Sequence, residues 1–147
     1  MSEEIAVGIL NMVITVVIHG CAQILITRRM LALQDIGAEA PLWLDFWWVS
    51  AVVIIVFFAT LLGAIWWALC YVYLGALPTS EEAMYFSMVT YTTLGYGDIT
   101  LGEEWRILSA FQAANGVIIA GWSTALVIAV VQRITQARHS ALSNTTS

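Results

Sequence analysis

Three long runs of apolar residues dominate the chain, and polar residues interrupt them at only a few places. The runs extend from Ile5 to Ile26, from Phe46 to Leu74 and from Trp105 to Val131. At a rise of about 1.5 Å per residue, a helix of about 20 residues crosses the roughly 30 Å of hydrocarbon in a bilayer. The pattern therefore predicts an all-α membrane protein with three transmembrane helices.

The first run is interpreted as a transmembrane helix and not as a secretory signal. It is too long for the core of a signal peptide, and Glu3 and Glu4 precede it where a signal peptide carries basic residues. A polar stripe follows one face of this helix, because polar residues recur at every fourth position. The stripe consists of Asn11, Thr15, His19, Gln23 and Thr27.

Such a stripe should face protein and not lipid. The structural interpretation is hydrogen bonding to the second or third span of the same or a neighbouring subunit, with Gln112 or Asn115 as candidate partners. The alternative is a proton-sensitive contact centred on His19, since histidine titrates near neutral pH and an ionisable group inside a membrane is a candidate for function.

Between the second and third runs lies a segment with a different pattern. Thr79 follows a proline and has Glu82 three residues later, a capping box that predicts a short helix over residues 80–92. The glycine-rich run Thr92-Thr93-Leu94-Gly95-Tyr96-Gly97-Asp98 comes next. Irregular backbone at membrane depth must be surrounded by protein or line a watery cavity. Alternating glycines allow several carbonyl oxygens to point the same way, which predicts a cation site.

This loop resembles the selectivity filter of the tetrameric potassium channels. Their T-V-G-Y-G motif is matched, with leucine in place of valine, by Thr93, Leu94, Gly95, Tyr96 and Gly97. The resemblance implies a re-entrant pore helix and filter loop, a homotetramer, and passive K⁺ conduction. It implies that K⁺ binds to the backbone carbonyls of Thr93, Leu94, Gly95 and Tyr96 and to the Thr93 hydroxyl.

The resemblance also divides the chain into three parts. Residues 46–133 correspond to a pore domain with an outer helix, a pore helix, the filter and an inner helix. Residues 1–45 are then an extra transmembrane helix with a cytoplasmic loop, and residues 134–147 are a short polar cytoplasmic tail. The extra helix lacks the repeated arginines of a voltage sensor, which disfavours direct voltage sensing.

Further positions are implied by the same resemblance. In the family, a carboxylate after the filter bonds to an aromatic residue of the pore helix, and here Asp98 and Tyr85 occupy these places. The family's inner helix bends at a glycine, and Gly116 fits that place, although a small residue equally permits close helix packing. If Gly116 is the hinge, helical spacing predicts a cavity-lining face. That face consists of Val117, Ala120, Thr124 and Ile128.

Composition and charge agree with this picture. Hydrophobic residues make up 61% of the chain and charged residues 10%, whereas soluble domains have about a quarter charged. Four of the five basic residues fall on one side of the membrane if all three runs cross it, and Arg106 falls on the other. The four are Arg28, Arg29, Arg133 and Arg138. Because cytoplasmic ends collect basic residues, we expect an external N-terminus and a cytoplasmic C-terminus in the cell (inner or plasma) membrane.

Several other classes of function are disfavoured. The sequence has no metal-ligand cluster, no nucleophile with a nearby base and no phosphate loop, so neither an enzyme nor a cofactor is expected. Cys21 and Cys70 lie in different runs, and no disulfide between them is expected. Expected partners are lipid and further copies of the chain, without nucleic acid or an identifiable small-molecule ligand. The alternatives to K⁺ selectivity are a low-selectivity cation channel, against which Tyr96 argues, and a non-conducting regulatory subunit of another channel, against which the intact filter argues.

The predicted orientation can be tested by labelling. Cysteines introduced at Ser2 and Ser143 should react with a membrane-impermeant thiol reagent from opposite sides, because three spans put the two ends on opposite faces. Labelling of both positions from one side would mean that the first apolar run does not cross the membrane or that it is removed.

Overall fold

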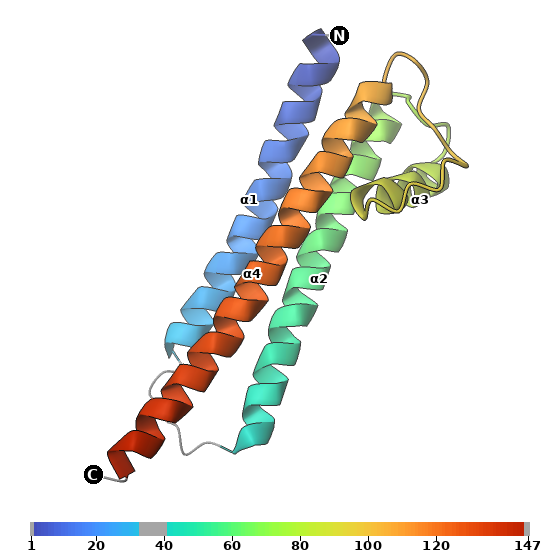
Figure 1. The fold of residues 1–147 in the computed structure, drawn as a ribbon. Helices are drawn as coiled ribbons and strands as arrows, with labels where there is room; N and C mark the ends of the chain where they lie inside the picture. The colour runs from blue at the N-terminus through green and yellow to red at the C-terminus, as the bar shows by residue number, and fades with distance from the viewer. Residues whose placement is uncertain (1, 33–40, 146–147) are drawn as a thin grey trace.

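The computed structural model describes residues 2–32 and 41–145, and these ranges contain four α-helices (Figure 1). They are α1 (Ser2–Ala32), α2 (Leu42–Tyr73), α3 (Ser80–Tyr91) and α4 (Arg106–Thr145). Three of the helices are long and apolar enough to cross a membrane. The predicted fold class of three long apolar helices and one short helix is therefore confirmed.

The three long helices lie side by side, and α1 packs against both α2 and α4. The short helix α3 packs on the same two helices, and in Figure 1 it lies on the opposite side of them from α1. The N-terminus lies at the end of the bundle where α3 and its loops are, and the chain ends at the other. The bundle thus presents α3 to one side and α1 to the other, with α2 and α4 between them.

Helix boundaries extend beyond the apolar runs, for reasons that are visible in the sequence. α2 begins at Leu42 because Pro41, with φ −64°, stands directly before it and cannot continue a helix toward the N-terminus. α4 continues past Val131 as far as Thr145. Neither glycine nor proline follows Gly121, so nothing local ends this helix. The predicted polar tail, residues 134–147, is therefore helical through residue 145.

The core lies where α3 meets α2 and α4. Trp67 and Tyr71 of α2 are fully buried, as is Leu108 of α4, and Phe86 of α3 is 6% exposed. The ring of Tyr71 lies edge-on to Phe86, with centroids 5.3 Å apart. These aromatic contacts fix α3 against the long helices, and each such pair contributes about 0.5–1.5 kcal/mol beyond the area it buries.

The polar stripe of α1 faces the protein, as predicted, and its upper part contacts α2. Asn11 is 4% exposed, and its Nδ2 donates to Cys70 Sγ at 3.3 Å. His19 is buried, with Nε2 3.3 Å from Thr60 Oγ1. Both cysteines are free thiols. The structural interpretation of the stripe, hydrogen bonding between helices, is confirmed at these residues, and the partners belong to the same chain.

The stripe also contacts α4. Asn115 Nδ2 donates to Thr15 Oγ1, and Trp122 Nε1 donates to Gln23 Oε1 at 2.7 Å. Asn115 is therefore one of the two partners expected from the sequence. The other expectation, Gln112, is wrong, because Gln112 faces α3 and bonds there instead. Thr27, the last residue of the stripe, is exposed, since a spacing of four drifts slowly around a helix of 3.6 residues per turn.

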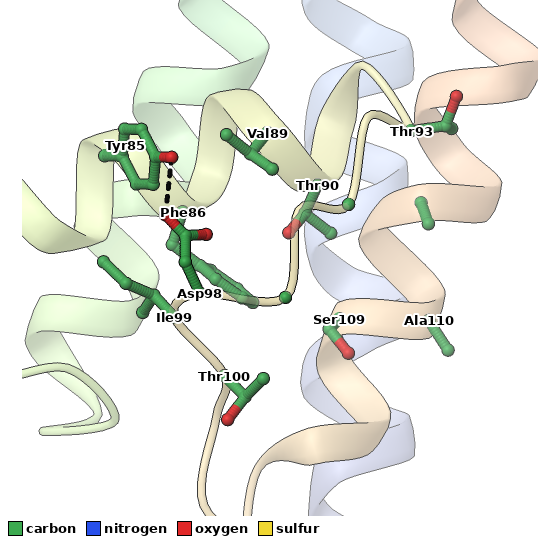
Figure 2. Close-up of a pocket in the computed structure, with 13 residues that line it drawn as sticks. Tyr85, Phe86, Val89, Thr90, Thr93, Asp98, Ile99, Thr100, Ser109 and Ala110 are labelled. Atoms are coloured by element: carbon green, nitrogen blue, oxygen red, sulfur yellow. Dashed lines mark hydrogen bonds between the residues drawn. The ribbon is translucent and has the colours of Figure 1, made fainter.

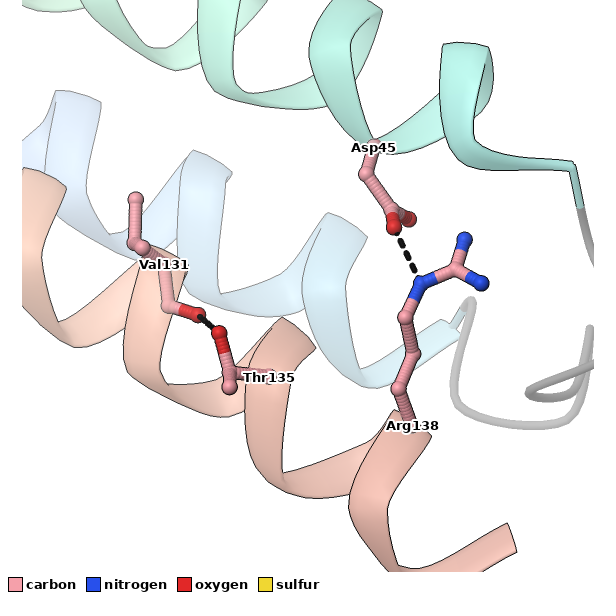
Figure 3. Close-up of polar contacts among 4 residues, drawn as sticks. All are labelled: Asp45, Val131, Thr135 and Arg138. Atoms are coloured by element: carbon pink, nitrogen blue, oxygen red, sulfur yellow. Dashed lines mark hydrogen bonds and ion pairs between the residues drawn. The ribbon is translucent and has the colours of Figure 1, made fainter. Parts of the chain in front are cut away.

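An ion pair joins α2 and α4 at the end of the bundle away from α3 (Figure 3). Arg138 Nε donates to Asp45 Oδ2, and the two side chains are 26% and 28% exposed. Thr135 does not reach across, because its hydroxyl donates to Val131 O of its own helix at 2.9 Å. Asp45 lies in the first turn of α2, where the helix dipole favours a negative charge.

We expect Asp45→Asn to lower the free energy of unfolding by less than about 1 kcal/mol, because solvent screens a partly exposed pair. The midpoint of thermal unfolding of the purified protein should fall slightly, and the difference from the parent should shrink in high salt. In a double-mutant cycle, Asp45→Asn and Arg138→Gln should be non-additive. Strict additivity would mean that the pair contributes nothing to stability.

Candidate functional site

The short helix α3 begins at a cap that the sequence predicted. Thr79 has extended backbone, and its Oγ1 accepts a hydrogen bond from the Glu82 N–H at 3.1 Å. This satisfies one of the free amides in the first turn. The helix ends at Tyr91, one residue before the predicted end, and the glycine-rich loop follows directly.

The loop has a backbone in which the sign of φ alternates. Thr93, Gly95 and Gly97 have φ of 62°, 57° and 77°, whereas Leu94 and Tyr96 do not have positive φ. Glycine adopts such angles freely, but Thr93 carries strain of about 1–3 kcal/mol there. A chain of alternating handedness can turn its N–H groups to one side and its carbonyl groups to the other. The arrangement suits a row of carbonyl oxygens facing a cation.

Hydrogen bonds tie the start of the loop to the last turn of α3. Val89 O accepts from the Leu94 and Gly95 N–H groups at 2.9 and 3.2 Å, and Thr93 N–H donates to Thr90 O at 3.0 Å. The loop backbone is thus anchored to the helix before it. The side chains of Leu94 and Tyr96 are 54% and 67% exposed in the single chain.

A cavity of about 330 Å³ lies between α3, the loop and α4 (Figure 2). Alternate residues of the loop line this cavity, namely Thr93, Gly95 and Gly97. The side chains that close it from the helices include Val89 of α3 and Ala113 of α4. The loop therefore has one face toward its own chain, while the side chains of the intervening residues are exposed.

Tyr85 and Asp98 hold the far end of the loop against α3 (Figure 2). Tyr85 Oη donates to Asp98 Oδ2 at 2.7 Å, which is the hydrogen bond that the resemblance implies. The bond lowers the pKa of the Asp98 carboxyl and raises the pKa of the Tyr85 hydroxyl. Both shifts favour the neutral phenol donating to the ionised carboxylate.

A buried network that sequence reasoning missed fixes the middle of α3. Gln112 Nε2 donates to Ser87 Oγ at 2.6 Å, and Tyr71 Oη donates to Gln112 Oε1 at 2.8 Å. Ser87 Oγ in turn donates to Ala64 O. All four residues come from α2, α3 and α4, and Gln112 and Ser87 have 0% exposure. The only signal in the sequence was a serine and an amide within apolar segments.

Gly116 lies where α4 meets the C-terminal end of α3. A Cβ placed on Gly116 would stand 1.9 Å from Tyr91 O, so no side chain fits at this position. This contact favours close packing as the reason for the glycine, one of the two interpretations that the sequence left open. Bending at Gly116 stays a prediction.

The four predicted cavity-lining residues share one side of α4. Val117, Ala120, Thr124 and Ile128 are all exposed in the single chain. Helical spacing separates this face from the buried face that carries Ile119. A surface this long and apolar is left for lipid, water or another chain to cover.

Comparison with known proteins identifies this region. A family model described as "Ion channel" matches residues 42–133, which is more than half of the 147-residue chain. The match takes in α2, α3, the glycine-rich loop and most of α4, and it leaves α1 outside. No curated protein and no solved structure matches the chain.

We predict that Tyr85→Phe raises the pKa of Asp98 toward the ordinary carboxyl value of about 4, because the donor that lowers it is lost. In the parent, the stabilising effect of the bond is present above that ordinary value and is lost as pH falls through the lowered pKa of Asp98. Since the pKa of Tyr85 is raised, the effect is also lost when pH rises through that raised value.

The measurement is an NMR titration of the Asp98 carboxyl carbon in the parent and in Tyr85→Phe. Tyr73→Phe is the matched control, because Tyr73 is a highly exposed tyrosine at the end of α2. An unchanged Asp98 titration in Tyr85→Phe would show that the bond does not persist in solution.

Proposed function

The chain belongs to the ion channel family, and we propose that it is a K⁺-selective channel that conducts ions passively through a pore made by four copies. The family is one of ion channels and not of enzymes, and the three long apolar helices make the chain a multi-pass membrane protein. The observation that carries the proposal is the alternating backbone of residues 93–97 in the T-L-G-Y-G loop.

In this proposal the loop replaces the water shell of K⁺. The ligands are the backbone carbonyls of Thr93, Leu94, Gly95 and Tyr96 and the Thr93 hydroxyl. The C-terminal end of α3 lies at the start of the loop, and its partial negative charge favours a dehydrated cation nearby. Tyr85 and Asp98 support the outer end of the filter through their hydrogen bond.

Four copies are needed because one loop cannot surround an ion. A ring of carbonyls requires cyclic symmetry about the conduction path, and the proposed assembly is a homotetramer. Exposed apolar surface supports this: Leu94, Tyr96 and Val117 are each more than half exposed in the single chain. The outward face of α4 would line the cavity below the filter, with Gly116 at its upper end.

The proposed orientation has the filter hairpin entering from outside, with the N-terminus outside and the C-terminus in the cytoplasm. The fold supports it, because the N-terminus and α3 lie at the same end of the bundle. Arg29 lies in the last turn of α1, and Arg138 lies near the end of α4, so both are at the opposite end. A cytoplasmic location of the basic end accords with the positive-inside rule.

We expect the purified protein in liposomes to carry K⁺ flux well above Na⁺ flux, and Gly95→Ala to abolish the flux or its selectivity. Gly95 has φ of +57° and nothing lies within 4 Å of an added Cβ, so the effect would come from backbone angle and not from crowding. Gly102→Ala is the matched control, because Gly102 also has open space but no positive φ.

The alternatives give different results in the same assay. Equal Na⁺ and K⁺ flux in the parent would replace the proposal with a low-selectivity cation channel. Absence of flux from a protein that native mass spectrometry shows to be tetrameric would favour a non-conducting subunit of another channel.

A further inference from the structure

Tyr91, the last residue of α3, is wedged between the two long helices that carry the pore domain. It is 3% exposed. A Cβ on Gly63 of α2 would stand 2.9 Å from Tyr91 Oη, and a Cβ on Gly116 of α4 would stand 1.9 Å from Tyr91 O. Each long helix therefore has a glycine where this one residue passes. Gly63 leaves room for the tip of the Tyr91 side chain, and Gly116 leaves room for the Tyr91 carbonyl.

On the far side the Tyr91 hydroxyl meets the extra helix. It lies beside the side chain of Thr15, which has 0% exposure. Thr15 Oγ1 donates to Asn11 O at 3.0 Å and accepts from Nδ2 of Asn115, the residue next to Gly116. Thus α1, which lies outside the family match, contacts the end of the pore helix through a junction of Thr15, Asn115 and Tyr91.

The junction has hydrogen-bonding capacity that its present arrangement leaves unused. Within residues 2–32 and 41–145, neither Tyr91 Oη nor Asn115 Oδ1 has a hydrogen-bond partner, although both atoms are buried. A hydroxyl oxygen can accept two hydrogen bonds, and Thr15 Oγ1 accepts one, from Asn115. Because each of these polar groups comes from a different helix, their hydrogen bonds depend on how α1, α3 and α4 are placed relative to one another.

The loop follows this junction without a spacer. Thr92 and Thr93 come directly after Tyr91, and Val89 O, in the same last turn of α3, holds the Leu94 and Gly95 amides. A shift of the Tyr91 end would therefore move the loop backbone, including the strained Thr93.

We propose that Thr15 and Asn115 are positioning residues that set the conformation of the filter through Tyr91, so that α1 is part of the filter's support. The effect on conduction rests on the proposed function, whereas the effect on the loop backbone does not. In this proposal α1, which lies outside the pore domain, helps to hold the loop in its conformation.

The test compares two α1–α4 hydrogen bonds in the full chain. Thr15→Val removes the hydroxyl at the junction with little change of shape, and Asn115→Leu removes the same bond from the other helix. Gln23→Leu is the matched control, because it removes the bond to Trp122 about 12 Å further along α1. Amide hydrogen exchange of Leu94 and Gly95 and the K⁺/Na⁺ permeability ratio are measured for each variant.

We expect Thr15→Val and Asn115→Leu each to raise exchange at the two loop amides by about tenfold, as expected for loss of one buried hydrogen bond, and to lower the permeability ratio. Gln23→Leu should leave both unchanged. Thr15→Ser keeps the hydroxyl, so this variant should retain the loop exchange and the permeability ratio of the parent. In a Tyr91→Leu background, Thr15→Val should have no further effect on the loop, because the connection is already broken.

Each outcome decides between the proposals. A selective parent channel whose loop exchange and permeability ratio do not respond to Thr15→Val or Asn115→Leu would overturn the positioning role. Equal responses to Thr15→Val and Gln23→Leu would overturn it too, since α1 would then act only by general packing. A parent that conducts no K⁺, but whose loop exchange rises in Thr15→Val and Asn115→Leu and not in Gln23→Leu, would refute the proposed function and support the positioning role.

Discussion

The structure depends on one constraint: in a membrane protein, non-helical backbone that lies among the helices must have its polar groups satisfied by protein or by water. The loop after α3 meets it partly by itself, since Val89 O accepts from the two amides of Leu94 and Gly95. These two hydrogen bonds hold the loop in place only if the C-terminal end of α3 is itself fixed. The buried network around Gln112 supplies that fixation, because it joins α3 to α2 and α4 with donors and acceptors that match. The long apolar helices thus serve as a frame that holds the short polar segment after α3 in place.

Small residues make this frame possible. Lipid is as apolar as the side chains, so membrane helices gain by close packing where small residues permit it. Gly63 and Gly116 act in this way on α2 and α4, and the residue that they admit is Tyr91. The contact at Gly116 bears on the hinge that the resemblance implies. If α4 bends there, the bend would occur against the carbonyl of Tyr91, the last residue of α3, so motion of α4 and conformation of the loop that follows would be mechanically linked.

Local signals in the sequence predicted much of this fold. The Thr79 cap and the end of α3 lie within one short segment, where spacing along the chain determines which groups can meet, whereas the bond between Tyr85 and Asp98 was implied by the resemblance of the loop to a known family. The partners of Gln112 and Asn115 could not be separated in this way. They are three residues apart, about 60° around one helix, so either amide could face α1 until the rotation of α4 is known. The contact between Gly63 and Tyr91 was missed for the same reason, because it depends on how α3 enters the bundle.

The helix α1 is attached to α2 and α4 by hydrogen bonds that are individually weak and by close packing. Among the residues that the structure describes, at least four hydrogen bonds join α1 to α2 and α4, and bonds between membrane helices average about 0.6 kcal/mol each, so these four together contribute roughly 2 kcal/mol. Packing adds to this at Gly8, where an added Cβ would stand 2.8 Å from the Phe111 ring. Because each bond contributes this little, α1 is held by the sum of these bonds and its packing, and the loss of a single bond should leave the helix in place. In the positioning role proposed above, the bond from Asn115 to Thr15 is the one through which a displacement of α1 would reach the loop, because Gly116, the neighbour of Asn115, lies against Tyr91 O at the end of α3.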